Sequence, residues 1–466
     1  MPDRLRPKSW PRASYDPRYD PLVDRGPGHN REYAPTYWIS TAGELPEDDG
    51  PIHKDVDVDV AVIGSGYTGL SCAVHLAKDH GIKAAVLEAN TVAWGCSTRN
   101  GGQAHFSSGR LRRSQWIKRW GMDTAMKMHG EFTEAFDLFR DLVNSEDFDC
   151  DAHHGGHFYI AHKPAVMKDL EEQTKLLNDV FGYGTRLMSR EELHEHHVKD
   201  QEAAGALFEP DGSSVHPAKL AFGYQKLARK LGATVHPASP VMGWKVVKGV
   251  HHLSTPGGTV RAGAVAIATG GYTPPGLNNK TKKRLMPILS NSIVTRPLTD
   301  EEYAECGFNT PLPLTDSRVL RHYYRVLPDR RVQIGGRSAI TGGDAENPKH
   351  MDLLLKGLYR KFPILEGVDI DYSWWGWVDV SHDMMPRIYQ PDPKLNICYS
   401  LGYGGNGVMY SAQAGRRMAQ ILAGKGKSLD LPIFSSPLPS HGILTPFRRI
   451  GQRIMYVVYH VQDEMF

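Results

Sequence analysis

Three glycines and one glutamate near the start of the chain have the types and spacing that bind a dinucleotide. They are Gly64, Gly66 and Gly69, with Glu88 placed 19 residues after the last of them. Gly64 permits a sharp turn, Gly66 lets the backbone approach a pyrophosphate, and Gly69 lets the following helix pack closely on a strand. The carboxylate of Glu88 would then accept hydrogen bonds from the adenosine ribose.

The elements that must position these residues are also predicted by the sequence. A β-branched run at 58–63 indicates a buried strand directly before the glycines. Apolar periodicity predicts a helix from Thr68 to His80, and a second strand over 84–87 leads into Glu88. The N-terminus of such a helix favours an anion. Nucleotide binding is the interpretation, with a glycine-rich structural turn as the alternative, and the acidic residue favours FAD or NAD over NADP.

A second glycine-rich stretch lies between Trp94 and Gln103. Its small residues and consecutive glycines let backbone N–H groups face an extended anionic ligand, although ordinary surface turns share such features. The residues expected to contact the ligand are Gly95, Cys96, Ser97, Arg99, Asn100, Gly101, Gly102 and Gln103.

The run Cys96-Ser97-Thr98-Arg99-Asn100-Gly101-Gly102-Gln103 resembles a segment of FAD-dependent amine oxidoreductases in the D-amino-acid oxidase superfamily. From about Tyr37 onward the chain resembles the gamma-glutamylputrescine oxidoreductases and their bacterial relatives. This resemblance implies FAD as a non-covalent cofactor, with a covalent link through Cys96 as the alternative. The implied fold is α/β, with a discontinuous Rossmann-like FAD-binding domain and a second, mainly antiparallel β-sheet substrate domain, as in D-amino-acid oxidase.

The resemblance also implies cofactor contacts outside these two stretches. The backbone at Val241 would meet the adenine, and the strand that ends in Thr269 and Gly270 would return to the dinucleotide. A second strand, glycine turn and helix, around 402–408, would place N–H groups under the flavin pyrimidine. Relatives commonly have histidine where this chain has Asn406. The remaining residues assigned to the cofactor are Ser65, Tyr67, Thr68, Ala89, Tyr403, Gly404, Gly405, Gly407 and Val408.

The two predicted domains alternate along the chain. Alternating, aromatic-rich runs indicate the antiparallel sheet, with strands at 292–295, 323–327 and 332–336. The expected order is an N-terminal arm (1–50), FAD-binding domain (51–108), substrate domain (109–207), FAD-binding domain (208–278), substrate domain (279–377), FAD-binding domain (378–430) and a basic C-terminal tail (431–466).

Three side chains are candidates for catalysis: His105, Tyr323 and Arg325. His105 and Tyr323 could shape the surroundings of an amine that must be neutral before it reacts, and each could equally be structural. Arg325 lies between apolar neighbours on a predicted strand, which suits a substrate clamp or a buried ion pair. The family's carboxylate-binding arginine falls nearest to Leu327, and this departure weighs against simple amino-acid substrates.

The resemblance implies a reaction as well. An amine C–N bond would be oxidised by hydride transfer to flavin N5, the imine would be hydrolysed, and O2 or another acceptor would reoxidise the flavin. The expected substrate is a small amine, namely a polyamine derivative, a secondary amine or an amino acid. Two alternatives remain open: an amino-acid dehydrogenase that passes electrons to a membrane quinone, and a non-catalytic FAD-binding subunit of a larger complex.

Composition restricts the other partners. A net charge of +3 over 466 residues gives no reason to expect nucleic acid. No apolar run reaches the about 18 residues that span a bilayer and no secretory signal is visible, so a cytoplasmic location is expected. Five scattered cysteines argue against a disulfide framework. No metal is predicted, because His153, His154 and His157 have no acidic or cysteine residue at a ligand spacing.

The two ends of the chain are predicted to be peripheral. Residues 1–50 are rich in proline and suit an arm that lies on the surface or stays partly disordered. Its end would be anchored against the nucleotide domain through Tyr33, Tyr37 and Trp38, which could equally contact a partner subunit. Beyond Pro432 a loop-like chain leads to a basic amphipathic tail at 447–459. This tail could contact a membrane, but docking on its own domain or on another subunit of a homo-oligomer is the more economical interpretation.

Overall fold

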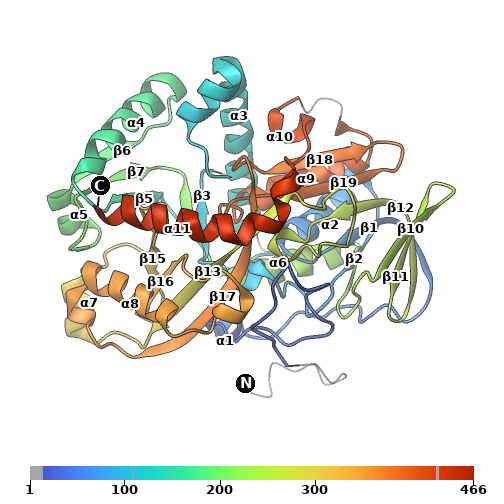
Figure 1. The fold of residues 1–466 in the computed structure, drawn as a ribbon, viewed down its shortest axis with the longest axis horizontal. Helices are drawn as coiled ribbons and strands as arrows, with labels where there is room; N and C mark the ends of the chain where they lie inside the picture. The colour runs from blue at the N-terminus through green and yellow to red at the C-terminus, as the bar shows by residue number, and fades with distance from the viewer. Residues whose placement is uncertain (1–13, 108, 146, 427–429, 466) are drawn as a thin grey trace.

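Two eight-stranded sheets dominate the computed structural model, which describes residues 14–107, 109–145, 147–426 and 430–465. The sheets stand side by side with helices around them (Figure 1). Because the strands of each sheet come from separate parts of the sequence, the chain passes from one sheet to the other and back more than once.

The first sheet contains the predicted dinucleotide turn. Its central strand β1 (Val56–Ile63) pairs in parallel with β2 (Ala84–Leu87) and β12 (Gly258–Ile267). The inner ends of these strands are buried, which explains their β-branched and small residues. The other strands are β9 (Thr234–His236), β10 (Gly243–Val247), β11 (Val250–Thr255), β18 (Arg387–Asp392) and β19 (Ile397–Leu401).

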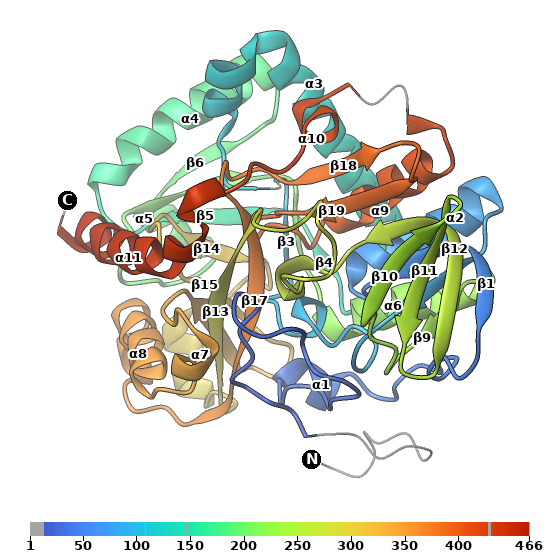
Figure 2. The same cartoon turned by 45° about the vertical axis from the view of Figure 1, so that its right-hand side comes forward.

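Three helices pack together against the first sheet, and the turned view in Figure 2 shows them behind β10–β12. They are α2 (Tyr67–His80), α6 (Pro217–Lys230) and α9 (Tyr410–Leu422). The helix predicted from Thr68 to His80 is therefore confirmed as α2.

The second sheet is antiparallel except where β14 lies parallel to β5. The strands predicted at 292–295 and 332–336 are confirmed within β13 (Leu285–Thr295) and β16 (Val332–Gly336), and the strand predicted at 323–327 is confirmed as β15, which ends one residue earlier, at Val326. In spatial order its strands are β17 (Ile370–Ser381), β13 (Leu285–Thr295), β16 (Val332–Gly336), β15 (Tyr323–Val326), β14 (Leu314–Asp316), β5 (His157–Ala161), β7 (Gly205–Glu209) and β6 (Arg186–Ser189).

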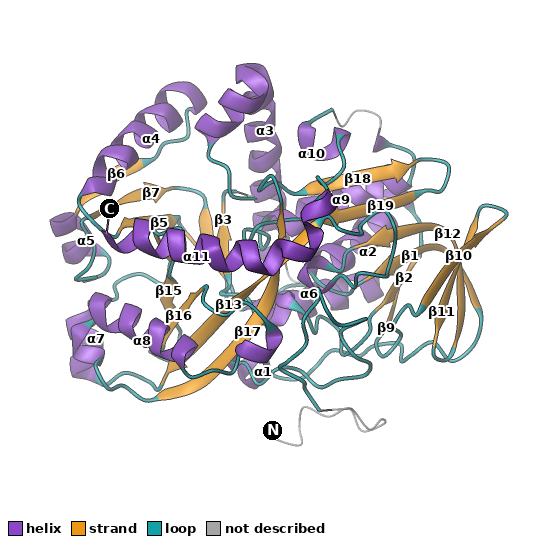
Figure 3. Ribbon diagram, in the orientation of Figure 1, coloured by secondary structure: helices purple, strands orange, loops and turns teal. Residues whose placement is uncertain are grey.

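The remaining elements lie around the two sheets, and Figure 3 distinguishes their helices from their strands by colour. The long helix α3 (Arg113–Val143) bends at Gly121, whose φ of 80° is not helical. The others are the three-stranded sheet of β3 (Gln103–His105), β8 (Gly212–Ser214) and β4 (His153–His154), with helices α4 (Ala165–Phe181), α5 (Arg190–His196), α7 (Asp300–Cys306) and α8 (Lys349–Lys361).

The predicted anchor of the N-terminal arm at Tyr37 and Trp38 is confirmed, and the arm is also buried earlier, around Tyr19, which the sequence did not predict. Tyr19, Tyr37 and Trp38 are buried, the last two within the short helix α1 (Tyr37–Thr41). The Trp377 indole N–H donates to the Tyr19 carbonyl at 2.9 Å. These aromatic side chains supply an apolar surface that the proline-rich pattern did not reveal. Residues 1–13 lie outside the described part.

The basic amphipathic tail predicted at 447–459 lies within a helix that begins at Arg448. After the short α10 (Pro432–Ser435), the helix α11 (Arg448–Met465) crosses the front of the molecule in Figure 1. Its buried side includes Gln452 and Asp463. The Asp463 carboxylate accepts hydrogen bonds from the backbone N–H groups of Val319 and Leu320 at 2.8 and 3.0 Å, so the tail docks on its own chain.

The predicted fold class is confirmed by a Rossmann-like sheet built from three separate segments beside a mainly antiparallel sheet. The domain boundaries stay predictions. β7 crosses the expected boundary at 207, and β17 extends past the one at 377.

Candidate active site

A large cavity of about 1440 Å³ lies between the two sheets. Gly64 and Glu88 line it from the first sheet, and Ser290 and Tyr323 line it from the second. Typical ligand pockets measure about 300–1,000 Å³, so this cavity has room for a dinucleotide and a small substrate together.

The glycine turn forms one wall of the cavity. Gly64 has a φ of 102°, and a Cβ there would lie 2.6 Å from the Ala268 carbonyl oxygen. A Cβ on Gly69 would lie 1.9 Å from the Gly64 carbonyl oxygen, so Gly69 permits α2 to approach β1 although it does not itself line the cavity. Gly66 is the N-cap of α2 and has no side chain of its own, and the Ser97 hydroxyl accepts from the Tyr67 N–H at 3.1 Å. This N-terminus at the cavity wall fits the pyrophosphate of FAD.

Glu88 lies at the end of β2 and lines the same part of the cavity. Its carboxylate accepts hydrogen bonds from the Ser65 backbone N–H at 3.2 Å and the Ser65 hydroxyl at 2.7 Å. Burial raises the pKa of this carboxyl. Ser65 does not line the cavity, so its role is to orient Glu88. Ala89 and Val241 line the same region, as do residues 22–29 of the arm.

The segment from Gly95 to Gln103 is held in shape by its own polar groups. The Asn100 side chain donates to the Tyr67 hydroxyl at 3.1 Å and accepts from the Gly102 N–H at 2.8 Å. The Arg99 guanidinium donates to the Trp94 carbonyl at 2.9 Å. Apart from the buried Gly102, the residues assigned to the cofactor in this segment line the cavity, namely Gly95, Cys96, Ser97, Arg99, Asn100, Gly101 and Gln103.

Cys96 is a free cysteine within this segment. Burial raises the pKa of its thiol to about 12. A protonated thiol is a weak nucleophile, which favours non-covalent FAD over a link through this side chain.

The second glycine turn, between β19 and α9, faces the cavity from another side. Tyr403, Gly405, Asn406, Gly407 and Val408 line it, as do Thr68, Thr269 and Gly270, whereas Gly404 does not. The Asn406 amide donates to the Gly109 carbonyl at 2.8 Å. The Asp379 carboxylate accepts from the Gly402 N–H at 2.6 Å, which fixes the start of the turn.

Replacing Asp379 by asparagine is expected to stabilise the flavin-free protein more at about pH 8 than at about pH 4. Burial raises the pKa of this carboxyl from 3.8 to about 6. Since the folded-state pKa lies above the unfolded-state value, ionisation opposes folding increasingly as the pH rises through this range. Asparagine removes that cost, and its side-chain oxygen can still accept from Gly402.

Thermal unfolding of wild type and Asp379→Asn at both pH values measures this effect. The matched control is Asp59→Asn, because Asp59 is exposed on β1 and should give equal shifts at both pH values. An equal shift for Asp379→Asn at both pH values would contradict the assignment.

Two of the three predicted catalytic side chains line the cavity. The His105 ring lies 4.1 Å from the His157 ring, and burial, aided by the charge of Arg321, holds the pKa of His105 well below its usual value. The Tyr323 hydroxyl lies 3.0 Å from the Ser290 hydroxyl and 3.2 Å from that of Ser292. Both side chains are therefore neutral polar groups.

Arg325 lies away from the cavity, which corrects its assignment as a substrate clamp. Its guanidinium donates to the Val215 carbonyl at 2.8 Å and lies 5.0 Å from the Trp38 ring centroid. It is two residues along β15 from Tyr323, and the strand carries it about 7 Å further from the cavity. Its contacts identify a packing role.

Besides Arg25 of the arm, three arginines near the second sheet line the cavity and were not predicted from the sequence. Arg110 follows β3, Arg321 precedes β15 and Arg337 follows β16. They lie in loops, where no periodicity indicates which way a side chain points. Only the pairing of β15 with β16, which places Tyr323 opposite Gly335, shows that Arg321 and Arg337 share one end of the sheet.

Over the described ranges, no three His, Cys, Asp or Glu side chains are arranged to hold a metal ion. Among the helices of the described residues, none is long and apolar enough to cross a bilayer.

Known proteins are similar to this chain in sequence and in fold. Gamma-glutamylputrescine oxidoreductase of Escherichia coli strain K12 is 31% identical over 430 residues, which make up 90% of this chain and 97% of that protein. Glycine oxidase of Bacillus subtilis strain 168 is 23% identical over 80% of this chain and 95% of its own. The crystal structure of glycine oxidase from Geobacillus kaustophilus superposes with a TM-score of 0.69 at 20% identity, covering 81% of this chain and 97% of that one.

These similarities confirm the resemblance stated from the sequence, including that to gamma-glutamylputrescine oxidoreductase. They also confirm the expected enzyme class, an FAD-dependent oxidoreductase. The relatives are named for the amine or amino acid on which they act. The model of the DAO family, described as FAD dependent oxidoreductase, matches residues 59–421. The chain therefore belongs to the DAO family of FAD-dependent oxidoreductases, and FAD is its cofactor.

Proposed function

We propose that the protein oxidises a C–N bond of a small amine, which is a polyamine derivative, a secondary amine or an amino acid. One observation carries this proposal: the dinucleotide turn and a wall of neutral polar side chains face the same cavity. Gly66 belongs to the turn, and His105 and Tyr323 belong to the wall. The substrates in the names of the relatives support an amine.

The residues of the cavity can prepare such a substrate. FAD bound along the glycine turns would supply a hydride acceptor for the amine carbon. The Nδ1 atom of His105 is buried and has no hydrogen-bond partner among the described residues. A neutral imidazole there can accept a hydrogen bond from the amine. The Tyr323 hydroxyl, held by Ser290 and Ser292, can orient the amine from the second sheet.

Anaerobic mixing of the FAD-loaded protein with a panel of amines tests this function. Gamma-glutamylputrescine, putrescine, sarcosine and glycine are suitable, and loss of the flavin absorbance is the expected result for at least one of them. Dithionite serves as the control for a reducible flavin. If dithionite bleaches the flavin and no amine does, amine oxidation is contradicted. Admission of air then distinguishes O2 from another electron acceptor.

A second candidate is an amino-acid dehydrogenase that passes electrons to a membrane quinone. The observation that favours it is the outward side of α11, where several apolar side chains are exposed, among them Ile450, Ile454, Val457 and Val458. Such a surface suits contact with a membrane. Reoxidation by a soluble quinone and not by air would support this candidate, whereas rapid reoxidation by air would contradict it.

A further inference from the structure

Exposed apolar side chains concentrate near the C-terminus, at the 3₁₀ turn Gly442–Phe447 and along the helix α11 that follows it. Eight of the 18 large apolar side chains that are exposed among the described residues lie between Ile443 and Val458. We call this surface the apolar patch, and it includes Ile443, Leu444 and Phe447 of the turn and Ile450, Ile454 and Val458 of the helix. Large exposed apolar patches mark interaction sites.

The helix presents its part of the apolar patch outward and is fixed in that orientation. Ile450, Ile454 and Val458 recur at the helical spacing of four residues, so they share one side of α11. On the opposite side, Gln452 and Asp463 are buried against the body of the protein. The apolar patch therefore belongs to a docked helix, and it is not the product of a loose chain end.

Exposed lysines border the apolar patch. The His441 N–H, directly before the turn, donates to the Lys283 carbonyl at 2.9 Å. The loop that carries Lys280, Lys282 and Lys283 therefore lies beside the turn, and all three lysine side chains are exposed. Arg453 adds an exposed positive charge on α11 itself.

Carboxylates are missing from both segments that form this surface. The sequence has neither aspartate nor glutamate over residues 272–295 and 431–462. At the end of α11, Asp463 accepts from the Val319 N–H at 2.8 Å, and Glu464 lies 3.0 Å from Arg318. Those two acids are thus engaged by the protein itself. An apolar surface with a basic border matches the interface of an anionic lipid bilayer.

We propose that the apolar patch and its lysine border dock the protein on a membrane that contains anionic lipids. The helix α11 lies in the plane of the interface, with its apolar side toward the acyl chains and the lysines at the lipid phosphates. This inference goes beyond both candidate functions, because it requires neither a particular amine nor a particular electron acceptor. Leu277 and Lys280 of the lysine loop also line the cavity, so docking brings one edge of the cavity to the bilayer.

A second copy of the chain fits this surface less well. A symmetric dimer would place the apolar patch of one copy against the same patch of the other. Arg453, Lys282 and Lys283 would then approach their own counterparts, and like charges repel. Lipid phosphates supply the opposite charge instead.

Co-sedimentation of the FAD-loaded protein with lipid vesicles tests the docking surface. We expect binding to vesicles of phosphatidylcholine mixed with phosphatidylglycerol, and binding at least about 10-fold weaker to phosphatidylcholine alone. Ile454→Glu combined with Val458→Glu should weaken binding to the anionic vesicles by at least about 10-fold, because two carboxylates replace apolar contacts. Lys282→Gln combined with Lys283→Gln is a second variant, and it should weaken the same binding by about 10- to 30-fold.

Val247→Glu is the matched control. Val247 is 42% exposed on β10, at the edge of the first sheet, and does not line the cavity, so this variant should bind vesicles as wild type does. Absence of binding to the anionic vesicles, equal binding to both kinds of vesicle, or full binding by either double variant would overturn the proposal.

Light scattering tests the second copy as the alternative occupant. A dimer in wild type that becomes a monomer in the Ile454→Glu, Val458→Glu variant would overturn membrane docking, because another copy would then cover the apolar patch. A wild type that stays monomeric and binds the anionic vesicles supports it. These outcomes are distinct from the fate of the proposed function, since neither measurement uses an amine or an electron acceptor.

Discussion

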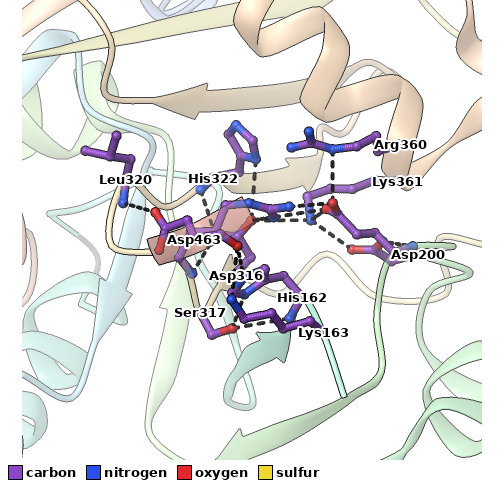
Figure 4. A network of polar contacts seen from close by, with 12 residues as sticks. His162, Lys163, Asp200, Asp316, Ser317, Leu320, His322, Arg360, Lys361 and Asp463 are labelled. Carbon is purple, nitrogen blue, oxygen red and sulfur yellow. Dashed lines mark hydrogen bonds and ion pairs between the residues drawn. The ribbon is translucent and has the colours of Figure 1, made fainter. Parts of the chain in front are cut away.

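Replacing Lys361 by methionine is expected to lower the free energy of unfolding by about 3–5 kcal/mol, because it leaves buried carboxylates without their cation. Lys361 is fully buried at the end of α8. Its ammonium lies 3.1 Å from Glu202, 3.4 Å from Asp200 and 3.5 Å from Asp316 (Figure 4). Although burial raises the pKa of Asp316, Lys361 and its other neighbours hold that pKa well below the usual value.

Urea unfolding of the FAD-saturated protein measures the loss of stability. Lys356→Met is the matched control, because Lys356 lies on the exposed side of the same helix. That control should change stability by no more than about 0.5 kcal/mol. If Lys361→Met fell within the same narrow range, Arg318, which also contacts Asp316 and Glu202, would be sufficient to balance the buried acids.

The second large effect is expected at the dinucleotide turn. Gly69→Ala should weaken FAD binding by about 10- to 100-fold. Overpacking costs about 1–3 kcal/mol, and here the added atom would displace the glycine turn that binds the cofactor. The new Cβ would lie 1.9 Å from the Gly64 carbonyl oxygen. To avoid this contact α2 must move away from β1, and the N–H groups at its start then lose their position.

The ratio of flavin to protein after purification, and the Kd from quenching of flavin fluorescence, measure this effect. Gly130→Ala is the control, since Gly130 lies within helix α3 and nothing is within 4 Å of an added Cβ. Alanine at that position should leave FAD binding unchanged and stabilise the protein slightly. Wild-type affinity in Gly69→Ala would contradict the close packing of helix and strand.

The parts of the fold that the sequence could predict depend on local patterns. The strand before Gly64, the helix after Gly66 and the acid at Glu88 lie within one short segment, so spacing alone identifies them. The antiparallel strands were visible for a similar reason, because alternation along a strand is a property of neighbouring residues. Tyr323 was recognised as a candidate catalytic residue because it lies on one of these predicted strands, and it does line the cavity.

The rest depends on contacts between distant parts of the chain. Arg110, Arg321 and Arg337 meet only because β3, β15 and β16 end near one another, and no pattern around each residue reports that. Arg325 misled for the same reason, since the pattern of a strand does not report where a residue lies along the cavity. The docking site of the amphipathic tail was likewise hidden, because the partners of Asp463 are Val319 and Leu320, far earlier in the chain.

The packed N-terminal arm has a consequence for how the enzyme matures. Residues 22–29 line the cavity, and Tyr19 is secured by Trp377, which belongs to one of the later strands. The segment that leaves the ribosome before any strand therefore reaches its final position only after the second sheet has formed. We expect the arm to close over the cofactor as a late step of folding, and to make FAD release slow once closed.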